Sequence, residues 1–435
     1  MRPGRRKEYD QTVRLFQAIG RASLAVDIQN SHSGNMAVIF REPGGREIMA
    51  VTATGSQKGD LEAEDIRFLP MKETDYQSQG ASRESLVHAR VLNLKDVRAS
   101  LHAHAKDLTI ITLDDEPKPH VSRPFIPVDP LGFFYLKGLV PVEWMEVPSG
   151  SPEMAEVVSS RLALSPAVVI QAHGTFTRGR TLEEAFFHAC LANNSAYIIR
   201  LLEKLKVDVE SLRAEAQARP EFYFDPRLSV YEIGGRVTRW THGEDGAEFV
   251  KASARLFESR LSPFHTGSAS MRFGENLLFA PQASRPRDIG GPLRRLPLGA
   301  GKGDSFEAGR HKALYAAGDF RALLHCYLPE AEALARGADP DTGRPAERLT
   351  AIDAEGRYLY SHLPIVAPGV ETAELGRLIA EHPLVVVRGG GVWASGQRAL
   401  SEALHHLSSL RDICLYRIGA LERGLDLRIM ELARS

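Results

Sequence analysis

Residues 82–104 have the sequence SRESLVHARVLNLKDVRASLHAH, and residues 305–327 have the sequence SFEAGRHKALYAAGDFRALLHCY. Aligned without a gap, the two stretches share eight identities in 23 positions, well above what unrelated stretches share. The chain is therefore predicted to contain an internal duplication, and each motif in it has to be interpreted twice, once in each copy.

Matching segments flank both stretches in the same order. Upstream, SHSGNMAV at 31–38 pairs with FHTGSASM at 264–271. Downstream, VVIQAHGTFTRG at 168–179 pairs with VVVRGGGVWASG at 385–396, and an amphipathic helix is predicted after each. This shared order predicts two related units, one in each half of the chain.

The chain divides into a first unit at 8–210, a connecting segment at 211–245 and a second unit at 246–435. The connecting segment contains Pro, Gly and aromatic residues, which favours an ordered connection over a flexible linker. Within each unit, short apolar runs typical of strands alternate with helical periodicity, and the strongest helix is predicted at 181–205. This alternation predicts α/β or α+β layers.

Composition limits the classes of function. The 435 residues suit two or three domains of about 100–200 residues each. A net charge of −1, with no long run of one sign, argues against nucleic acid or an anionic membrane as partner. The basic start MRPGRRK lacks the apolar core of a secretory signal, and no stretch approaches the roughly 18 apolar residues of a membrane span, so we expect a cytoplasmic protein. Three widely spaced cysteines predict neither a disulfide framework nor a cysteine-only metal site.

Two histidines in the first unit have the spacing of a chelating pair. On a strand, His102 and His104 lie two positions apart, so both imidazoles lie on one face, as metal chelation requires. The same pattern also occurs as two unrelated histidines. His173 follows an apolar run. Glu84 lies near the start of a helical stretch, and by itself this position is more typical of a solvated first-turn carboxylate that the helix dipole favours. Taken singly, none of these residues decides between a metal site and a structural role.

Five motifs in a fixed order carry a family resemblance. They are S-G-N at 33–35, T-x-T-G at 52–55, S-x-E at 82–84, H-x-H at 102–104 and H-G at 173–174. In this order they resemble the class II aldolase/adducin superfamily, typified by fuculose-phosphate aldolase, over nearly all of the first unit. The second unit resembles it more weakly. The resemblance implies two tandem three-layer α/β/α domains, each with a central, largely antiparallel sheet flanked by helices.

The resemblance also implies a chemistry. His102, His104 and His173 match the histidines that hold one divalent metal ion, zinc first, with manganese, cobalt or iron as alternatives. Glu84 matches the catalytic acid/base. Three neutral imidazoles leave a coordination position open for substrate oxygens, and a metal there would stabilise the enediolate formed when a carbon–carbon bond beside a carbonyl breaks. The implied function is a metal-dependent lyase, an aldolase acting on a small phosphorylated or carboxylated sugar-like substrate.

A further set of residues matches positions that cradle a substrate phosphate in the family. These are Gly34, Asn35, Thr54, Gly55 and Ser82, with Arg83 where aldolases of the family usually have a second serine. Taken alone, the two glycine-containing motifs are also typical of plain turns. The Arg83 guanidinium suits a phosphate, a carboxylate or simple exposure to solvent, so an acidic substrate other than a phosphosugar is also credible.

The second unit retains little of this set. The aligned residues are His325, Tyr327 and Gly390 for the three histidines, Glu307 for Glu84, Ser268 for Asn35 and Phe306 for Arg83. Because one imidazole cannot keep a catalytic divalent ion, we expect this unit to be non-catalytic and His325 to be a buried, hydrogen-bonded core residue. His88 and His311 recur four residues after each glutamate, which favours a structural role for both.

Two classes of function remain open. The first is the aldolase, with epimerase, dehydratase or decarboxylase activity as alternatives on the same scaffold. The second is a non-catalytic, adducin-like assembly protein, which we expect to lack the metal histidines that this chain retains. Because members of the family resemble four-fold tetramers with sites at subunit borders, the duplicated chain is predicted to form a homodimer with a pseudo-four-fold ring.

Overall fold

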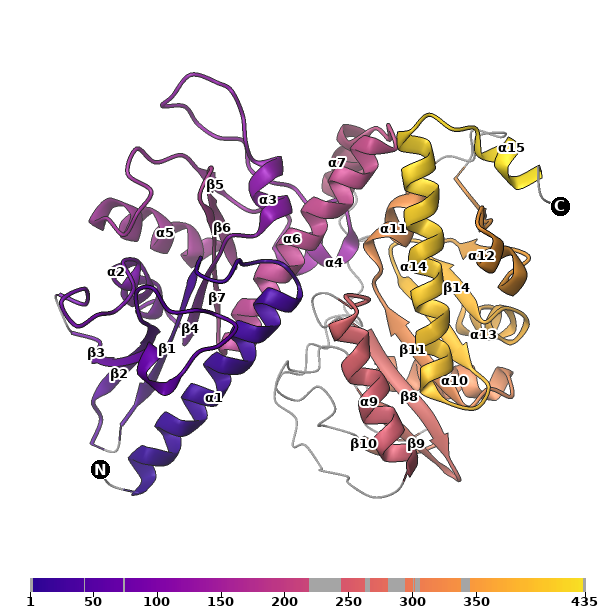
Figure 1. Ribbon diagram of the computed structural model, residues 1–435, viewed down its shortest axis with the longest axis horizontal. Helices are drawn as coiled ribbons and strands as arrows, with labels where there is room; N and C mark the ends of the chain where they lie inside the picture. The colour runs from indigo at the N-terminus through magenta and orange to yellow at the C-terminus, as the bar shows by residue number, and fades with distance from the viewer. Residues whose placement is uncertain are drawn as a thin grey trace. The chain divides into compact units, whose positions relative to one another are not determined.

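The computed structural model describes residues 3–42, 44–72, 75–218, 244–262, 267–280, 294–299, 301, 306–337 and 345–432. The chain forms two compact units (Figure 1): one comprises Met1–Pro127 and Leu131–Tyr197, the other Val128–Pro130 and Ile198–Ser435. Most of the predicted connecting segment, and part of the FHTGSASM motif, lie outside the described residues.

The first unit is built on a seven-stranded sheet. Its strands are β1 (Asn35–Arg41), β2 (Glu47–Thr52), β3 (Ile66–Pro70), β4 (Ala99–Ala103), β5 (Val142–Glu143), β6 (Ala167–Ile170) and β7 (Gly174–Gly179). They are ordered β3-β2-β1-β4-β7-β6-β5. All neighbours pair antiparallel except β5 and β6, which are parallel.

Helices cover both faces of this sheet. They are α1 (Pro3–Ala25), α2 (Ser85–Leu92), α3 (Lys106–Ile111), α4 (Pro130–Tyr135), α5 (Pro152–Leu164) and α6 (Leu182–Lys204), with a short 3-10 turn at Ala63–Asp65. The next helix, α7 (Val209–Ala218), belongs to the second unit. In Figure 1, α2 and α5 lie on one side of the sheet, and α1 and α6 lie on the other. Val87 of α2 and Val158 of α5 pack with Phe176 of β7 in one fully buried apolar core, which fixes α2 over the centre of the sheet.

The second unit has an eight-stranded sheet. Its strands are β8 (Gly267–Phe273), β9 (Asn276–Ala280), β10 (Arg294–Pro297), β11 (Ala322–Cys326), β12 (Arg348–Leu349), β13 (Leu363–Val366), β14 (Leu384–Val387) and β15 (Gly391–Gly396). Its helices are α9 (Glu244–Glu258), α10 (Phe306–Ala317), α11 (Pro329–Arg336), α12 (Ala354–Leu359), α13 (Thr372–Glu381), α14 (Leu400–Glu422) and α15 (Leu427–Leu432). Leu314 of α10 and Leu375 of α13 share a core with the sheet, as α2 and α5 do in the first unit.

The two sheets have the same topology. The second runs β10-β9-β8-β11-β15-β14-β13 and then adds β12 at its edge, and its one parallel pair, β13 with β14, occupies the place of β5 with β6. The register is shared as well: His102 pairs with Asn35, and His325 pairs with Ser268. The predicted duplication and the predicted tandem α/β fold, with largely antiparallel sheets between helices, are confirmed.

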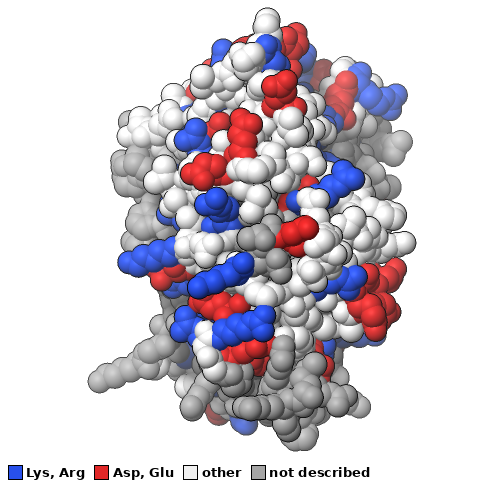
Figure 2. All heavy atoms as spheres, turned by 90° about the vertical axis from the view of Figure 1, so that its left-hand side faces the viewer, with Lys and Arg blue, Asp and Glu red and all other residues white. Residues whose placement is uncertain are grey.

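The surface has no dominant charge on the face drawn in Figure 2, where basic and acidic side chains are interspersed. Within the part of the chain that the structure describes, no helix is both long enough and apolar enough to cross a membrane.

Candidate metal centre

Three histidines of the first unit meet where β4 ends and β7 begins. His102 lies in β4, His104 directly follows that strand, and His173 lies in the turn between β6 and β7. Antiparallel pairing sets His102 opposite Phe176 and thereby brings the two ends together. One ring nitrogen of each histidine lies within 4.8 Å of the other two. Among the described residues, these three form the one group of three or more His, Cys, Asp or Glu side chains placed to hold a metal ion.

The turn that carries His173 is tight. Ala172 has a φ of 57°, in the left-handed region that residues with a Cβ rarely adopt. The backbone N–H of His173 donates to the carbonyl of Ile170 at 3.1 Å. This geometry reverses the chain between two paired strands and directs His173 toward the end of β4.

The rings are held so that nitrogen lone pairs converge. His102 Nδ1 lies 3.2 Å from the carbonyl oxygen of Thr175, which accepts its proton and leaves the lone pair on Nε2. The His102 ring stacks on Phe176, with 4.1 Å between centroids and 13° between planes. His102 Nε2 and His104 Nε2 lie 3.2 Å apart, and His173 Nδ1 is buried without a hydrogen-bond partner. Three imidazoles that each offer a ring nitrogen within 4.8 Å of the others fit a divalent cation.

Burial favours the neutral form of these histidines. Burial lowers the pKa of His102 well below its usual value, and the neighbouring histidines lower it further. Burial also lowers the pKa of His104, to about 4, and that of His173. Metal ligation requires unprotonated imidazole nitrogens, so the site needs little proton release to bind a cation near neutral pH.

Glu84 lies beside the histidines and is held by two donors. It is the residue before the first turn of α2 and is 9% exposed. Asn35 Nδ2 donates to its Oε2 at 2.7 Å, and Ser82 Oγ donates to the same oxygen at 2.9 Å. Burial lowers the pKa of both His104 and His173, and the negative charge of Glu84 has the opposite, smaller effect on each pKa. The carboxylate is therefore an ordered part of the site and not a solvated helix-terminal charge.

The aligned place in the second unit is closed by protein groups. His325 is fully buried, with Nδ1 2.6 Å from Glu307 Oε1 and Nε2 2.7 Å from the carbonyl oxygen of Gly390. The ring is therefore held on both sides by protein groups, and neither nitrogen is left to bind an ion. The ring stacks on Trp393 as His102 stacks on Phe176. As expected, His325 is a buried, hydrogen-bonded core residue.

Residues 14–199 and 247–418 each match the sequence model of the class II aldolase and adducin N-terminal domain. The chain belongs to the class II aldolase and adducin family. The two matched segments carry the two sheets described above, so the family domain occurs twice in tandem.

Solved structures similar to this chain include several aldolases. L-fuculose-1-phosphate aldolase from Thermus thermophilus is 28% identical, with a TM-score of 0.38, over 43% of this chain and 92% of that one. Sugar-phosphate aldolase from Thermotoga maritima is 18% identical, with a TM-score of 0.35, over 45% of this chain and 96% of that one. An aldolase II superfamily protein from Pseudomonas syringae is 16% identical, with a TM-score of 0.38, over 48% of this chain and 84% of that one.

In this class II aldolase family member, the residues predicted to cradle an anion separate into two groups. Asn35 and Ser82 are buried and hydrogen-bond to Glu84, as described above. Thr54, Gly55 and Arg83 are exposed. Thr54 Oγ1 donates to the carbonyl oxygen of Ala81 at 2.8 Å, which ties its turn to the segment before α2.

Gly34 lies close to the metal centre. Its φ is 70°, and a Cβ built there would lie 2.4 Å from the carbonyl oxygen of His102 and 2.2 Å from Gln29 Nε2. Gln29 Nε2 itself donates to that carbonyl at 2.8 Å. Glycine is therefore required at this position by both conformation and space, and the turn packs directly against the backbone of a predicted metal ligand.

A buried lysine is the residue of this region that sequence reasoning missed. Lys58 is 2% exposed, and its Nζ donates to the Ser56 carbonyl at 2.8 Å, to Ser56 Oγ at 3.2 Å and to the His32 carbonyl at 3.4 Å. Burial lowers its pKa to about 8. It joins the S-H-S-G-N turn to the T-x-T-G turn. In the sequence it stands between polar residues, in SQKGD, and nothing in that pattern predicts burial.

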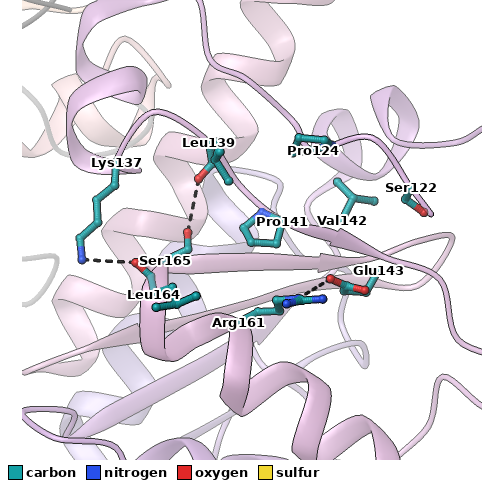
Figure 3. Close-up of a pocket in the computed structure, with 10 residues that line it drawn as sticks. All are labelled: Ser122, Pro124, Lys137, Leu139, Pro141, Val142, Glu143, Arg161, Leu164 and Ser165. Atoms are coloured by element: carbon teal, nitrogen blue, oxygen red, sulfur yellow. Dashed lines mark hydrogen bonds and ion pairs between the residues drawn. The ribbon is translucent and has the colours of Figure 1, made fainter. Parts of the chain in front are cut away.

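A separate groove of about 330 Å³ lies in the same unit (Figure 3). Its lining includes Arg161, which pairs with Glu143, and Lys137, whose Nζ lies 3.4 Å from the carbonyl oxygen of Leu164. None of the three histidines or Glu84 lines it. The groove therefore takes no part in the candidate metal centre.

Proposed function

We propose that the chain is a divalent-metal-dependent lyase whose first unit is catalytic, an aldolase that cleaves or forms a carbon–carbon bond beside a carbonyl. The observation that carries this proposal is the convergence of three neutral histidine nitrogens within 4.8 Å of one another. Family membership supports the same class of chemistry. The substrate we propose is a small phosphorylated or carboxylated sugar-like molecule.

His102, His104 and His173 would hold the ion. When bound, zinc or another divalent ion supplies positive charge beside substrate oxygens and lowers the energy of the negative charge that develops there. The protein contributes a rigid site for it: Phe176 and the Thr175 carbonyl fix the His102 ring, and the tight turn at Ala172 fixes His173.

Glu84 would move the proton. Its Oε2 is occupied by Asn35 and Ser82, whereas its Oε1 has no hydrogen bond among the described residues. Oε1 is therefore the atom that we assign to proton uptake and return. In the cleavage direction Oε1 would accept the hydroxyl proton of the substrate as the carbon–carbon bond breaks, and it would return the proton to the carbon beside the carbonyl. In the synthetic direction it would remove that C–H proton and deliver it to the oxygen of the aldehyde as the new bond forms.

The exposed turn at Thr54 and Gly55, with Arg83, would bind the acidic group of the substrate. Gly55 has a φ of 78°, and a Cβ built on it would meet no atom within 4 Å, so its backbone is open to a ligand. Lys58 adds a buried positive charge to the base of this turn.

The second unit would serve as scaffold. Its His325 and Glu307 satisfy each other, so this unit needs no ion to neutralise the buried carboxylate. We propose that two chains form a homodimer with a pseudo-four-fold ring, in which second units complete the walls of the catalytic sites.

Proton exchange tests this function directly. With zinc-loaded protein in D₂O, NMR would follow exchange of the C–H protons beside the carbonyl of dihydroxyacetone phosphate and of pyruvate, one phosphorylated and one carboxylated probe. We expect exchange with at least one probe. Glu84→Gln should slow it by about 10²-fold or more, which is the scale of general acid–base catalysis, while keeping the metal.

The matched variants separate the outcomes. His102→Ala should lose both metal and exchange, because a ligand is removed. Undiminished exchange in Glu84→Gln would contradict the role of this carboxylate. Protein that takes up no metal and exchanges neither probe would favour the adducin-like assembly role instead.

A further inference from the structure

His88 is a buried histidine that touches the catalytic machinery without being part of it. It lies one helical turn after Glu84 on α2 and is fully buried. Its Nε2 lies 2.5 Å from Asn35 Oδ1. Burial lowers the pKa of His88 to about 3, so the ring is neutral and carries one proton.

Hydrogen bonding decides which nitrogen carries that proton. Asn35 Oδ1 is an acceptor, so the 2.5 Å contact needs a proton on His88 Nε2. His88 Nδ1 is buried and has no hydrogen-bond partner. The proton on Nε2 thus makes the one hydrogen bond that this ring forms with the residues that the structure describes.

The same contact orients the Asn35 amide. With Oδ1 facing His88, Nδ2 faces Glu84 and donates to Oε2 at 2.7 Å. The reversed amide would place Oδ1 against the carboxylate oxygen, two acceptors at hydrogen-bond distance, which is unfavourable in a buried site. A proton on His88 Nε2 and the Glu84 carboxylate therefore favour the same orientation of the Asn35 amide.

The second unit contains an equivalent chain of contacts. His311 Nε2 lies 2.7 Å from Ser268 Oγ, and Ser268 Oγ lies 2.5 Å from Glu307 Oε1. There the far side of the ring is also engaged, because Ser270 Oγ lies 2.6 Å from His311 Nδ1. In the first unit the aligned residue is Ala37, whose side chain cannot form a hydrogen bond, and among the described residues Asn35 is the one hydrogen-bond partner of the His88 ring.

We propose that His88 is a positioning residue for Glu84: its Nε2–H fixes the Asn35 amide, and the amide holds Oε2 so that Oε1 faces the substrate. This proposal rests on the proposed acid/base function of Glu84. It assigns His88 a part in the reaction, whereas the recurrence of this histidine as His311 in the second unit favoured a purely structural role.

The test compares His88→Gln with His88→Leu. A glutamine amide nitrogen can occupy the place of Nε2 and donate to Asn35, whereas leucine cannot. We expect His88→Leu to keep its metal and its apparent affinity for the exchanging probe, but to lose at least tenfold in the rate constant of proton exchange in D₂O. His88→Gln should recover most of that loss. The matched control, His311→Leu in the second unit, should leave the exchange rate unchanged.

A second readout needs no substrate. In protein labelled with ¹⁵N-histidine, the resonances that disappear in His88→Gln should belong to a neutral ring protonated at Nε2 and unprotonated at Nδ1. A proton on Nδ1 would overturn the proposal, as would a His88→Leu exchange rate within twofold of the unsubstituted protein, or His88→Gln and His88→Leu losing equally. If the unsubstituted protein exchanges neither probe, the proposed function fails. The tautomer of His88 would still show whether its Nε2–H donates to Asn35 as proposed.

Discussion

The aligned carboxylates Glu84 and Glu307 have different hydrogen-bond partners, because Asn35 of the first unit is replaced by Ser268 in the second. In the first unit, Asn35 donates to one oxygen of Glu84 and leaves the other available. In the second, Ser268 and His325 both contact the same oxygen of Glu307. The carboxylate that we propose for proton transfer in the first unit thus corresponds to a carboxylate that a buried histidine holds in the second.

Replacing Gly34 should damage the metal centre through the backbone. In Gly34→Ala, the new Cβ would clash with the His102 carbonyl oxygen and the Gln29 amide, and the residue would also be strained at a φ of 70°. We expect the free energy of unfolding to fall by about 2 kcal/mol or more and metal affinity to fall with it. Chemical denaturation and metal titration measure the two effects.

The matched control for that variant is Gly55→Ala. Its φ is 78°, but no atom lies within 4 Å of the added Cβ, so the conformational strain of about 1–2 kcal/mol is the full cost. If both variants lost the same free energy of unfolding, the close contact between Gly34 and the His102 carbonyl would contribute nothing to the effect.

At the scale of elements, the sequence predicted more of the fold than of the contacts within it. The predicted helix at 181–205 is observed as α6, Leu182–Lys204, and the two-residue spacing of His102 and His104 does bring their rings together at the end of β4. These features depend on periods of two and 3.6 residues, which are local. The contact between Asn35 and Glu84 was not predictable in this way, because Asn35 lies in β1, 49 residues away in the chain.

The buried ion pair between α10 and β11 should make the second unit sensitive to acid. Although burial alone raises the pKa of Glu307, the charge of His325 and its hydrogen bond lower it to about 2. Between its ordinary value of 4.5 and about 2, the unfolded chain takes up a proton that the folded chain does not. The stabilising contribution of Glu307 is therefore complete above about pH 4.5 and is lost as the pH falls.

Glu307→Gln measures this contribution. The difference in free energy of unfolding between the unsubstituted protein and the variant should shrink by about 2 kcal/mol from pH 6 to pH 3, following about 1.4 kcal/mol per unit of pKa difference. Chemical denaturation at both pH values gives the two differences. A difference that stays constant with pH would show that His325 and Glu307 do not form a charged pair in the folded protein.

At the scale of the whole molecule, one chain contains two copies of the same sheet topology with different chemistry at the same register. His102 and His325 occupy equivalent places opposite β1 and β8, yet one belongs to a group of three histidines and the other is closed off by Glu307 and the Gly390 carbonyl. The repeated motifs were sufficient to predict the duplication. The closed second site could not be predicted in detail, because it depends on which acceptors face each nitrogen of a single ring.

The metal content of the purified chain is the measurement that tests the central claim most directly. Elemental analysis of the unsubstituted protein, His173→Ala and His325→Ala should find about one divalent ion per chain in the first, a loss of the ion in the second and no change in the third. No ion in the unsubstituted protein after resupply would contradict a metal-dependent first unit, and two ions per chain, or loss of the ion in His325→Ala, would contradict a closed, metal-free second unit.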